Sequence, residues 1–141
     1  MAIYSLSQRT TNFTSAQACW ELRTAASDRV VVLEIGFNTN TATAQTIGLG
    51  RPAAQGITPV NVLFQAEDSA SPASVTNASL SWGTSPTVPA QFLRRVSLPA
   101  TAGAGIIWTF PRGLIVPVSA SLVLWNITTS VAADVWVVID E

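Results

Sequence analysis

The sequence predicts an all-β protein built as a sandwich or barrel of about 8–10 strands. Short runs of β-branched and aromatic residues recur about every 8–14 residues, and clusters of Pro, Gly, Asn and Ser separate them. No internal repeat of roughly 20–50 residues is visible, which argues against a propeller or a solenoid. The chain has 141 residues, the size of one domain.

The N-terminal segment alternates weakly between apolar and polar residues. Residues 3–7 fit a short strand, with Tyr4 and Leu6 on one face. The rest of residues 1–14 is polar and weakly patterned. We therefore expect residues 1–14 to form an N-terminal arm or a first edge strand, and residues 15–141 to form a single β-sandwich domain.

The next segment, residues 15–26, is ambiguous. Its alanines favour a helix, whereas Trp20 and Leu22 alternate with charged neighbours as in a strand. A tight turn is expected at residues 26–29, because Ser and Asp bond their own backbone locally. We favour a strand that pairs as a hairpin with the β-branched residues 30–37, and a helix is the alternative.

The middle of the chain predicts strands broken by polar loops. These strands cover residues 41–49, 60–66, 79–82 and 91–98. Pro72 lies in the polar loop 67–74, and the loop 83–89 holds two prolines. Both loops are expected at the surface.

The last third has the most regular pattern. Residues 106–110 predict a strand that Pro111 cuts, and Pro117 restricts residues 113–116 to an edge strand or a strand end. Two further apolar strands are expected at residues 121–126 and 135–139.

The missing residue types exclude much catalytic chemistry. The chain has no His and no Lys, so it has no imidazole base or metal ligand, no Schiff-base lysine and no Walker loop. Its single Cys19 permits neither an internal disulfide nor a multi-thiolate zinc site. We expect no enzymatic activity and no cofactor or metal.

Charge is scarce. Charged residues are 11% of the chain, against about 25% in an average soluble domain, and the net charge is -1. We expect other subunits to cover part of the surface; the alternative is that Ser and Thr carry its hydration. No basic stripe predicts nucleic-acid binding, and no apolar run, signal segment or targeting motif predicts a membrane.

Five tryptophans are many for this length. Trp108, Trp125 and Trp136 sit inside strongly apolar runs, so we expect them in the sandwich core. Trp82, between Ser81 and Gly83 at the mouth of a loop, is the best candidate for an exposed contact, with a core position equally open.

Arg94 and Arg95 are the only two basic residues that are adjacent in the sequence. On a strand they point to opposite faces, so one is expected to meet a carboxylate or a neighbouring subunit. An equally weighted alternative is that both arginines are solvated and prevent the edge strand from pairing with another sheet. Together with Trp82, these two arginines are the candidate interface residues.

For the remaining candidate residues we expect ordinary structural roles. Glu67 and Asp68 are adjacent in a loop, whereas a glycosidase needs two facing carboxyl groups roughly 5–10 Å apart, so we expect a solvated loop tip. The pair Asp140–Glu141 is expected to be a polar end after a buried strand. Cys19 lies between Ala18 and Trp20 and is expected to be an inert core thiol.

Several stretches resemble the small jelly-roll structural proteins of tailed-phage virions, especially head decoration (cement) proteins. The stretches are residues 34–37, 48–54, 92–95, 108–114, 122–126 and 137–141. The resemblance lies in chain length and in the alternation of short β-rich runs with Pro, Gly, Asn and Ser clusters over most of the chain. It includes no catalytic signature. It implies a jelly-roll-like antiparallel β-sandwich that oligomerises, commonly as a trimer, on a capsid lattice.

The sequence therefore predicts a non-enzymatic virion structural protein, assembled in the host cytoplasm, that stabilises a capsid by binding across its subunits. The expected partners are further copies of this chain, as a homotrimer, and the major capsid protein. The alternative is a carbohydrate- or receptor-binding module of a phage tail spike or fibre, with Trp82 and neighbouring loops as its platform.

Overall fold

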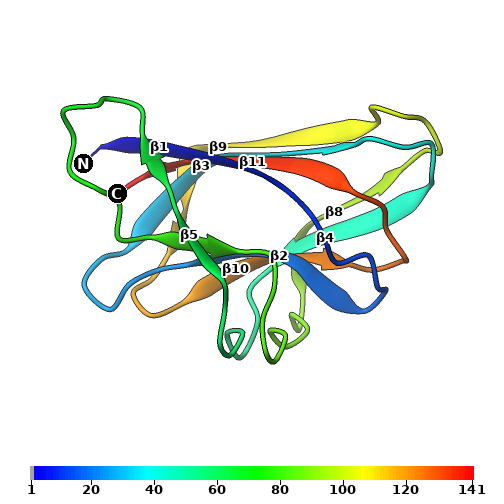
Figure 1. Cartoon of the computed structure of the whole chain (residues 1–141), viewed down its shortest axis with the longest axis horizontal. Helices are drawn as coiled ribbons and strands as arrows, with labels where there is room; N and C mark the ends of the chain where they lie inside the picture. The colour runs from blue at the N-terminus through cyan, green and yellow to red at the C-terminus, as the bar shows by residue number, and fades with distance from the viewer. Residues whose placement is uncertain (1) are drawn as a thin grey trace.

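Two antiparallel sheets pack face to face in the computed structural model, which describes residues 2–141 (Figure 1). The five-stranded sheet has the order β6 (Gln65–Ala66), β1 (Ile3–Arg9), β11 (Ala133–Asp140), β3 (Val30–Thr39) and β9 (Gly105–Val116). The six-stranded sheet has the order β5 (Asn61–Leu63), β7 (Asn77–Ser79), β2 (Gln17–Arg23), β10 (Ser121–Asn126), β4 (Gln45–Gly50) and β8 (Phe92–Leu98).

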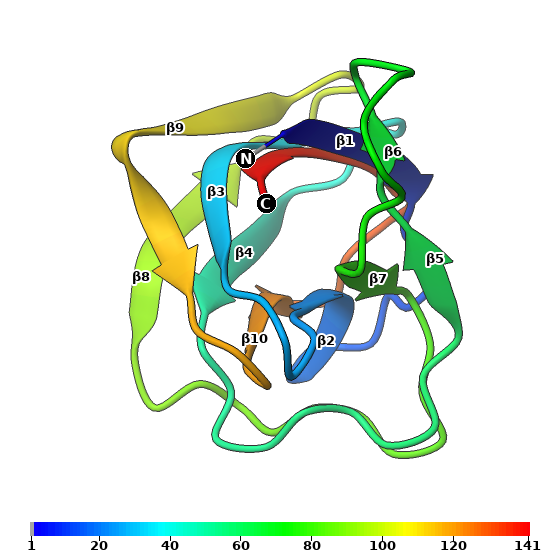
Figure 2. The ribbon, with the colours of Figure 1, turned by 90° about the vertical axis from the view of Figure 1, so that its left-hand side faces the viewer.

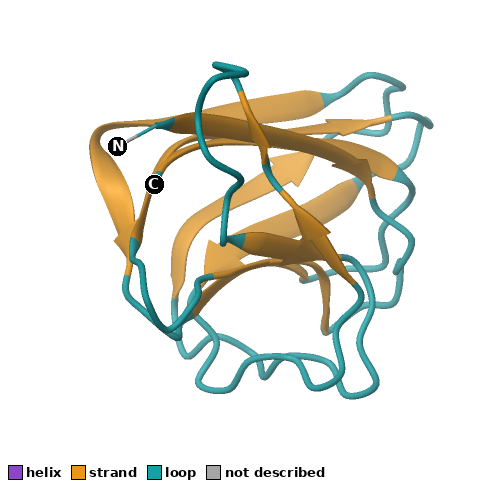
Figure 3. Cartoon of the chain, turned by 60° about the vertical axis from the view of Figure 1, so that its left-hand side comes forward, coloured by secondary structure: helices purple, strands orange, loops and turns teal. Residues whose placement is uncertain are grey.

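The all-β prediction is confirmed, since strands and loops account for residues 2–141 (Figure 3). Accordingly, this part of the chain has no helix long and apolar enough to cross a membrane.

The strand order is that of a jelly roll. From β1 to β4 and again from β8 to β11, the chain crosses between the two sheets at every step. The resulting four-stranded sets are β1-β11-β3-β9 and β2-β10-β4-β8, which form a double-sheet jelly roll. The three short strands β5, β6 and β7 are an insertion between β4 and β8 that extends both sheets on one side (Figure 2).

The expected hairpin between residues 15–26 and 30–37 is wrong, although both segments are strands rather than helices. β2 pairs with β10 and β7, whereas β3 pairs with β11 and β9 in the other sheet. The turn at residues 24–29 therefore carries the chain across the sandwich. Two adjacent apolar strands predict a hairpin, but their patterns hold no information about which sheet each one joins.

The N-terminal residues take part in the five-stranded sheet. Residues 3–9 form β1, which pairs along its whole length with β11 and over two residues with β6. Met1, the first residue of the proposed arm, lies outside the described residues. Both ends of the chain lie close together at one end of the sandwich, where Ala2 and Glu141 exchange two backbone hydrogen bonds (Figure 1).

Several predicted strand boundaries differ from the structure: β4 begins at Gln45 and not at residue 41, and β7 covers residues 77–79 where residues 79–82 were expected. Residues 60–66 divide at Phe64 into β5 and β6, which belong to different sheets. Pro111 does not cut the strand, because β9 runs through it as a bulge in which residues 110–113 stand opposite Leu33. Proline is tolerated there since β9 is an edge strand and needs no bond on its outer side.

The core lies between the sheets, and a second small cluster lies outside the six-stranded sheet. The main core includes Trp20, Phe37 and the apolar residues of β10 and β11 that face inward. The outer cluster consists of Ala18, Val123 and Trp125. Two loops, residues 51–60 and 80–91, pair with each other through Ile57 and Thr84 and cover this side of the sheet, as the segments below β2 and β10 in Figure 1 show.

Candidate functional site

Trp82 follows β7 and is half-buried beside the cluster outside the six-stranded sheet. Its indole Nε1–H donates a hydrogen bond of 2.6 Å to Oε2 of Glu21. A Cβ at Gly56 would collide with the Trp82 ring, so the ring packs directly against the Gly56 backbone. Trp82 therefore anchors a loop, and its polar atom is already used within the chain.

Glu21 is the centre of this anchor and is fully buried. Its Oε1 accepts a hydrogen bond of 3.2 Å from the Gly56 backbone, and its Oε2 also accepts one of 3.3 Å from Arg23. Arg23 continues to the Gly56 carbonyl and the Gln55 side chain. A buried charge is tolerated only when it is paired and hydrogen-bonded, so this cluster ties both covering loops to β2.

An open pocket of about 280 Å³ lies beside Trp82. The side chains that surround it are mostly polar and are Thr11, Asn12, Gln17, Leu80, Ser81, Trp82 and Ser85. Amides, hydroxyls and an aromatic ring in one depression offer hydrogen bonds and an apolar surface to a small polar ligand.

Arg94 and Arg95 are both exposed on β8, an edge strand. Arg94 stands opposite the core residue Leu49 and points to the gap between the sheets, where its guanidinium lies 5.6 Å from the centre of the Phe110 ring. Arg95 stands opposite Gly48 on the other side of the strand. Neither arginine forms an ion pair within residues 2–141, so the expected carboxylate partner is not in this part of the chain.

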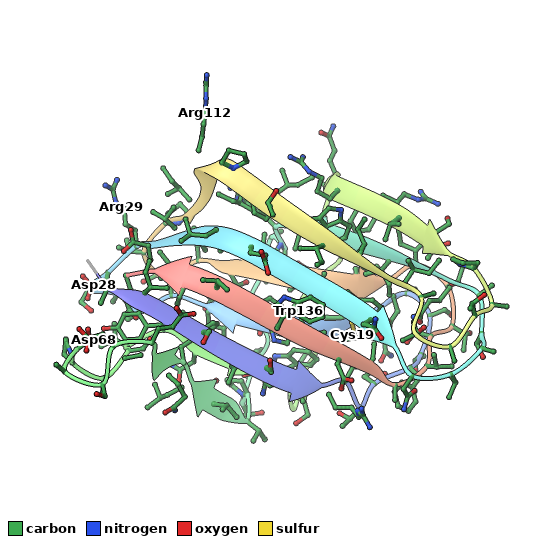
Figure 4. The ribbon with its side chains drawn as sticks, turned by 90° about the horizontal axis from the view of Figure 1, so that it is seen from above. Cys19, Asp28, Arg29, Asp68, Arg112 and Trp136 are labelled. Atoms are coloured by element: carbon green, nitrogen blue, oxygen red, sulfur yellow. The ribbon has the colours of Figure 1, made fainter. Side chains whose placement is uncertain are left out.

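A groove of about 430 Å³ separates β8 from β9. Leu93 and Arg94 form one wall, and residues 109–114, which include the bulge of β9, form the other. The Phe110 ring lies at its base, 8% exposed, and Arg112 stands on its rim and points away from β9 into solvent (Figure 4). The groove thus combines two cations with an apolar floor.

The outward side of the five-stranded sheet carries both apolar and charged side chains, and the charged ones are Arg9, Glu34, Asp134 and Asp140. We use "outer face" for its outward apolar side chains, which are Ile3, Val31, Leu33, Ile107, Ile115, Trp136 and Val138. Ile107 is 55% exposed and Ile115 is 46% exposed.

Trp136 lies near the middle of this outer face and not in the core as expected (Figure 4). Its ring packs against the backbone of Gly36, and its Nε1–H donates to Oε1 of Glu34 at 2.9 Å. The reason is that β11 alternates strictly, with Val135 and Val137 in the core and the residues between them outside. Trp125 is buried under the loops and Trp108 packs against the main core.

The other candidates hold structural positions. Burial raises the pKa of the Cys19 thiol to about 12. Glu67 and Asp68 are exposed at the start of a loop, and Glu141 accepts hydrogen bonds from residues 74–76. In the described part of the chain, no three His, Cys, Asp or Glu side chains gather as a metal site.

The sequence did not predict three features of these candidate sites: the burial of Glu21, the groove beside β9 and the outward position of Trp136. Glu21 reads as an exposed strand residue, because the loops that bury it come more than thirty residues later. The groove depends on the bulge at Pro111, where the pattern indicates a strand end. The outer position of Trp136 had a signal, the alternation of residues 133–140, but valines flank it on both sides and mask the pattern.

The structure therefore presents three separate surfaces: the pocket at Trp82, the groove beside Arg94 and the outer face. It does not bring Trp82 together with Arg94 and Arg95, because Trp82 lies in the loop after β7 and both arginines lie on β8, at the far edge of the six-stranded sheet. Comparison of the chain with protein-family models, with curated proteins and with solved structures found no match.

Proposed function

We propose that this chain is a non-enzymatic structural protein of a virion, which decorates and stabilises a capsid as an oligomer. Its partners are further copies of itself, as a homotrimer, and the major capsid protein. The proposal rests on the resemblance to head decoration proteins, and the jelly-roll topology is compatible with it.

The observation that carries the proposal is the outer face. Seven apolar side chains, one of them a tryptophan, lie on one open side of a sheet. Four charged side chains share this side of the sheet: Glu34 is bonded to Trp136, Arg9 pairs with Asp134 at one end, and Asp140 stands opposite Ile3 and Val31 at the other end. An exposed tryptophan among aliphatic side chains is a feature of the centre of protein interfaces, and charged side chains are typical of their rim. We assign this face to the capsid surface.

The side chains that could act as nucleophiles, acids or bases support a mechanical role. Cys19 is 1% exposed and its raised pKa keeps it a neutral thiol. Glu21 and Arg23 are occupied in the anchor of the covering loops. Asp68 accepts the backbone N–H of Ala70 in its own loop. These groups hold the fold together rather than converge on a common cleft.

The test begins with the genes that flank the one encoding this chain: the proposal expects a major capsid protein among them, and capsids assembled from that protein are then cosedimented with the chain. The wild-type chain should bind saturably, and the variant Ile107→Asp/Ile115→Asp should lose binding because two charges enter the outer face. The matched control is Val88→Asp, since Val88 is 57% exposed on a loop of the opposite sheet. Absence of wild-type binding, or equal binding by the outer-face variant, contradicts the proposal.

A second candidate, a carbohydrate-binding module of a tail spike or fibre, is favoured by the polar pocket beside Trp82. A glycan array is its test. Trp82→Ala is a poor probe alone because it also removes the bond to Glu21. Gln17→Ala, at the exposed rim of the pocket, should abolish glycan binding without disturbing the fold. If the wild-type chain binds no glycan on the array, the carbohydrate-binding function is excluded.

A further inference from the structure

Apart from Asp28, Arg29 and the Arg9–Asp134 pair, the exposed charges gather at two opposite edges of the sandwich. Between residues 69 and 133 the charged residues are Arg94, Arg95 and Arg112, all on β8 and β9. Arg51 joins them, since its guanidinium donates to the backbone of β9 at Ile115. This basic edge contains no carboxylate.

The opposite edge is acidic. Glu67 and Asp68 follow directly after β6, which is the last strand of the five-stranded sheet on the side away from β9. Both side chains are exposed, and no ion pair joins either of them to an arginine within residues 2–141. Figure 4 places Asp68 and Arg112 on opposite sides of the sheet, so these charges cannot neutralise each other within one copy.

The acidic edge has the form of a projecting loop. Residues 67–76 rise from the sandwich beyond β6, as Figure 2 shows. The tip is closed by a turn in which Ser71 N–H donates to the Asp68 carbonyl at 2.9 Å. The base is held by Tyr4, whose hydroxyl donates to the Pro72 carbonyl at 3.0 Å. The loop is therefore tethered at its base, and both acidic side chains are exposed, with Oδ1 of Asp68 accepting the Ala70 N–H and its Oδ2 left for a partner.

The basic edge has the complementary form of a groove. Its volume is about 430 Å³, and the Phe110 ring is among the groups that line it. Arg94 stacks over this ring and donates one N–H to the Leu93 carbonyl. A stacked guanidinium is held in place and presents its free N–H groups to a carboxylate, which Arg binds in a bidentate manner.

We propose that the acidic loop of one copy, residues 67–71, docks in the β8–β9 groove of a second copy. The inference deepens the proposed function, because it names the surfaces through which the chain self-associates. Loop and groove lie on different edges of one chain, so the contact is head-to-tail and repeats from copy to copy. A head-to-tail contact closes into a ring when the rotation per copy allows it, and a cyclic trimer is such a ring.

The test uses charge reversal and light scattering of the full chain at low ionic strength. The groove variant is Arg94→Glu/Arg112→Glu, and the loop variant is Glu67→Arg/Asp68→Arg. Each should weaken self-association by at least about tenfold, because like charges then face each other. The combined variant should assemble again, since all its contacts are reversed together. Arg29→Glu, an exposed arginine outside both edges, is the control and should leave assembly unchanged.

Far-UV circular dichroism shows whether each variant folds. If Arg94→Glu disturbs the packing on Phe110, Arg112→Glu alone keeps the test valid, because this side chain projects into solvent (Figure 4). Raising the salt concentration should also dissociate the wild-type assembly, since the Debye length falls to about 3 Å at 1 M.

The outcomes separate this inference from the proposed function. If the wild-type chain assembles and the groove and loop variants assemble equally well, or the combined variant stays dissociated, the docking inference is wrong while the structural role stands. If the wild-type chain is a monomer that binds no capsid, the proposed function fails and the docking inference fails with it.

Discussion

Replacing Trp82 by Phe tests whether Glu21 anchors the two covering loops. The change keeps an aromatic ring against Gly56 but removes the indole donor from the 2.6 Å bond to the buried carboxylate. A hydrogen bond to a charged group contributes about 1.5–3 kcal/mol to stability. Because Glu21 is fully buried, water does not replace the lost donor, so the upper part of this range applies.

The expected loss translates into a measurable shift. For a chain of 141 residues, 1 kcal/mol corresponds to about 3 °C in Tm, so the variant should melt about 7–9 °C lower. The assay is thermal and urea unfolding followed by far-UV circular dichroism at a fixed protein concentration, since self-association makes Tm depend on concentration.

The matched control is Trp136→Phe, which also removes an indole donor from a carboxylate. Its bond to Glu34 is 2.9 Å long and lies on the half-exposed outer face, where water can replace it. The loss of stability should therefore be well below that of Trp82→Phe. Equal losses, or a Trp82→Phe variant as stable as the wild type, would refute the anchoring role.

Three further predictions concern the core, the outer face and an ion pair. Cys19 should not react with a thiol reagent at pH 8 until the chain is denatured, because burial raises its pKa to about 12; rapid labelling of the native protein would contradict this. Gly36→Ala should push the Trp136 ring off the sheet, with a fluorescence shift and a stability loss of roughly 1–3 kcal/mol; an unchanged spectrum would count against the packing. The hydrogen bond from Arg9 lowers the pKa of Asp134 below its ordinary 3.8, so this pair stabilises the fold above that pH and the contribution disappears as the pH falls through the lowered value. Asp134→Asn should thus destabilise slightly at pH 7, with an effect that shrinks as the pH falls below 3.8, and a loss that stays constant in acid would be inconsistent with the pair.

Local pattern predicted most strands, because it reports which residues prefer a pleated, half-buried surface. The runs at residues 91–98, 121–126 and 135–139 correspond closely to β8, β10 and β11. Pairing was not predictable in the same way. The order β1-β11-β3-β9 joins the two ends of the chain, and no neighbour-to-neighbour pattern carries that information.

The candidate surfaces were predicted only in part. The doubled arginines indicated a cationic patch, and Arg94 indeed lines a groove, but the groove itself depends on a bulge in β9 that brings residues 110–113 beside it. Trp82 was singled out because of its polar neighbours. Its bond to Glu21, sixty-one residues earlier, became visible only when the fold brought β2 and the loop after β7 together.

The most direct test of the account is the mass of the wild-type chain in solution, measured by light scattering over a range of micromolar concentrations. We predict a stable assembly whose mass is a multiple of the 14.8 kDa chain, about 45 kDa for three copies. A monodisperse species of 14.8 kDa at every concentration would contradict the claim that copies of this chain associate with one another.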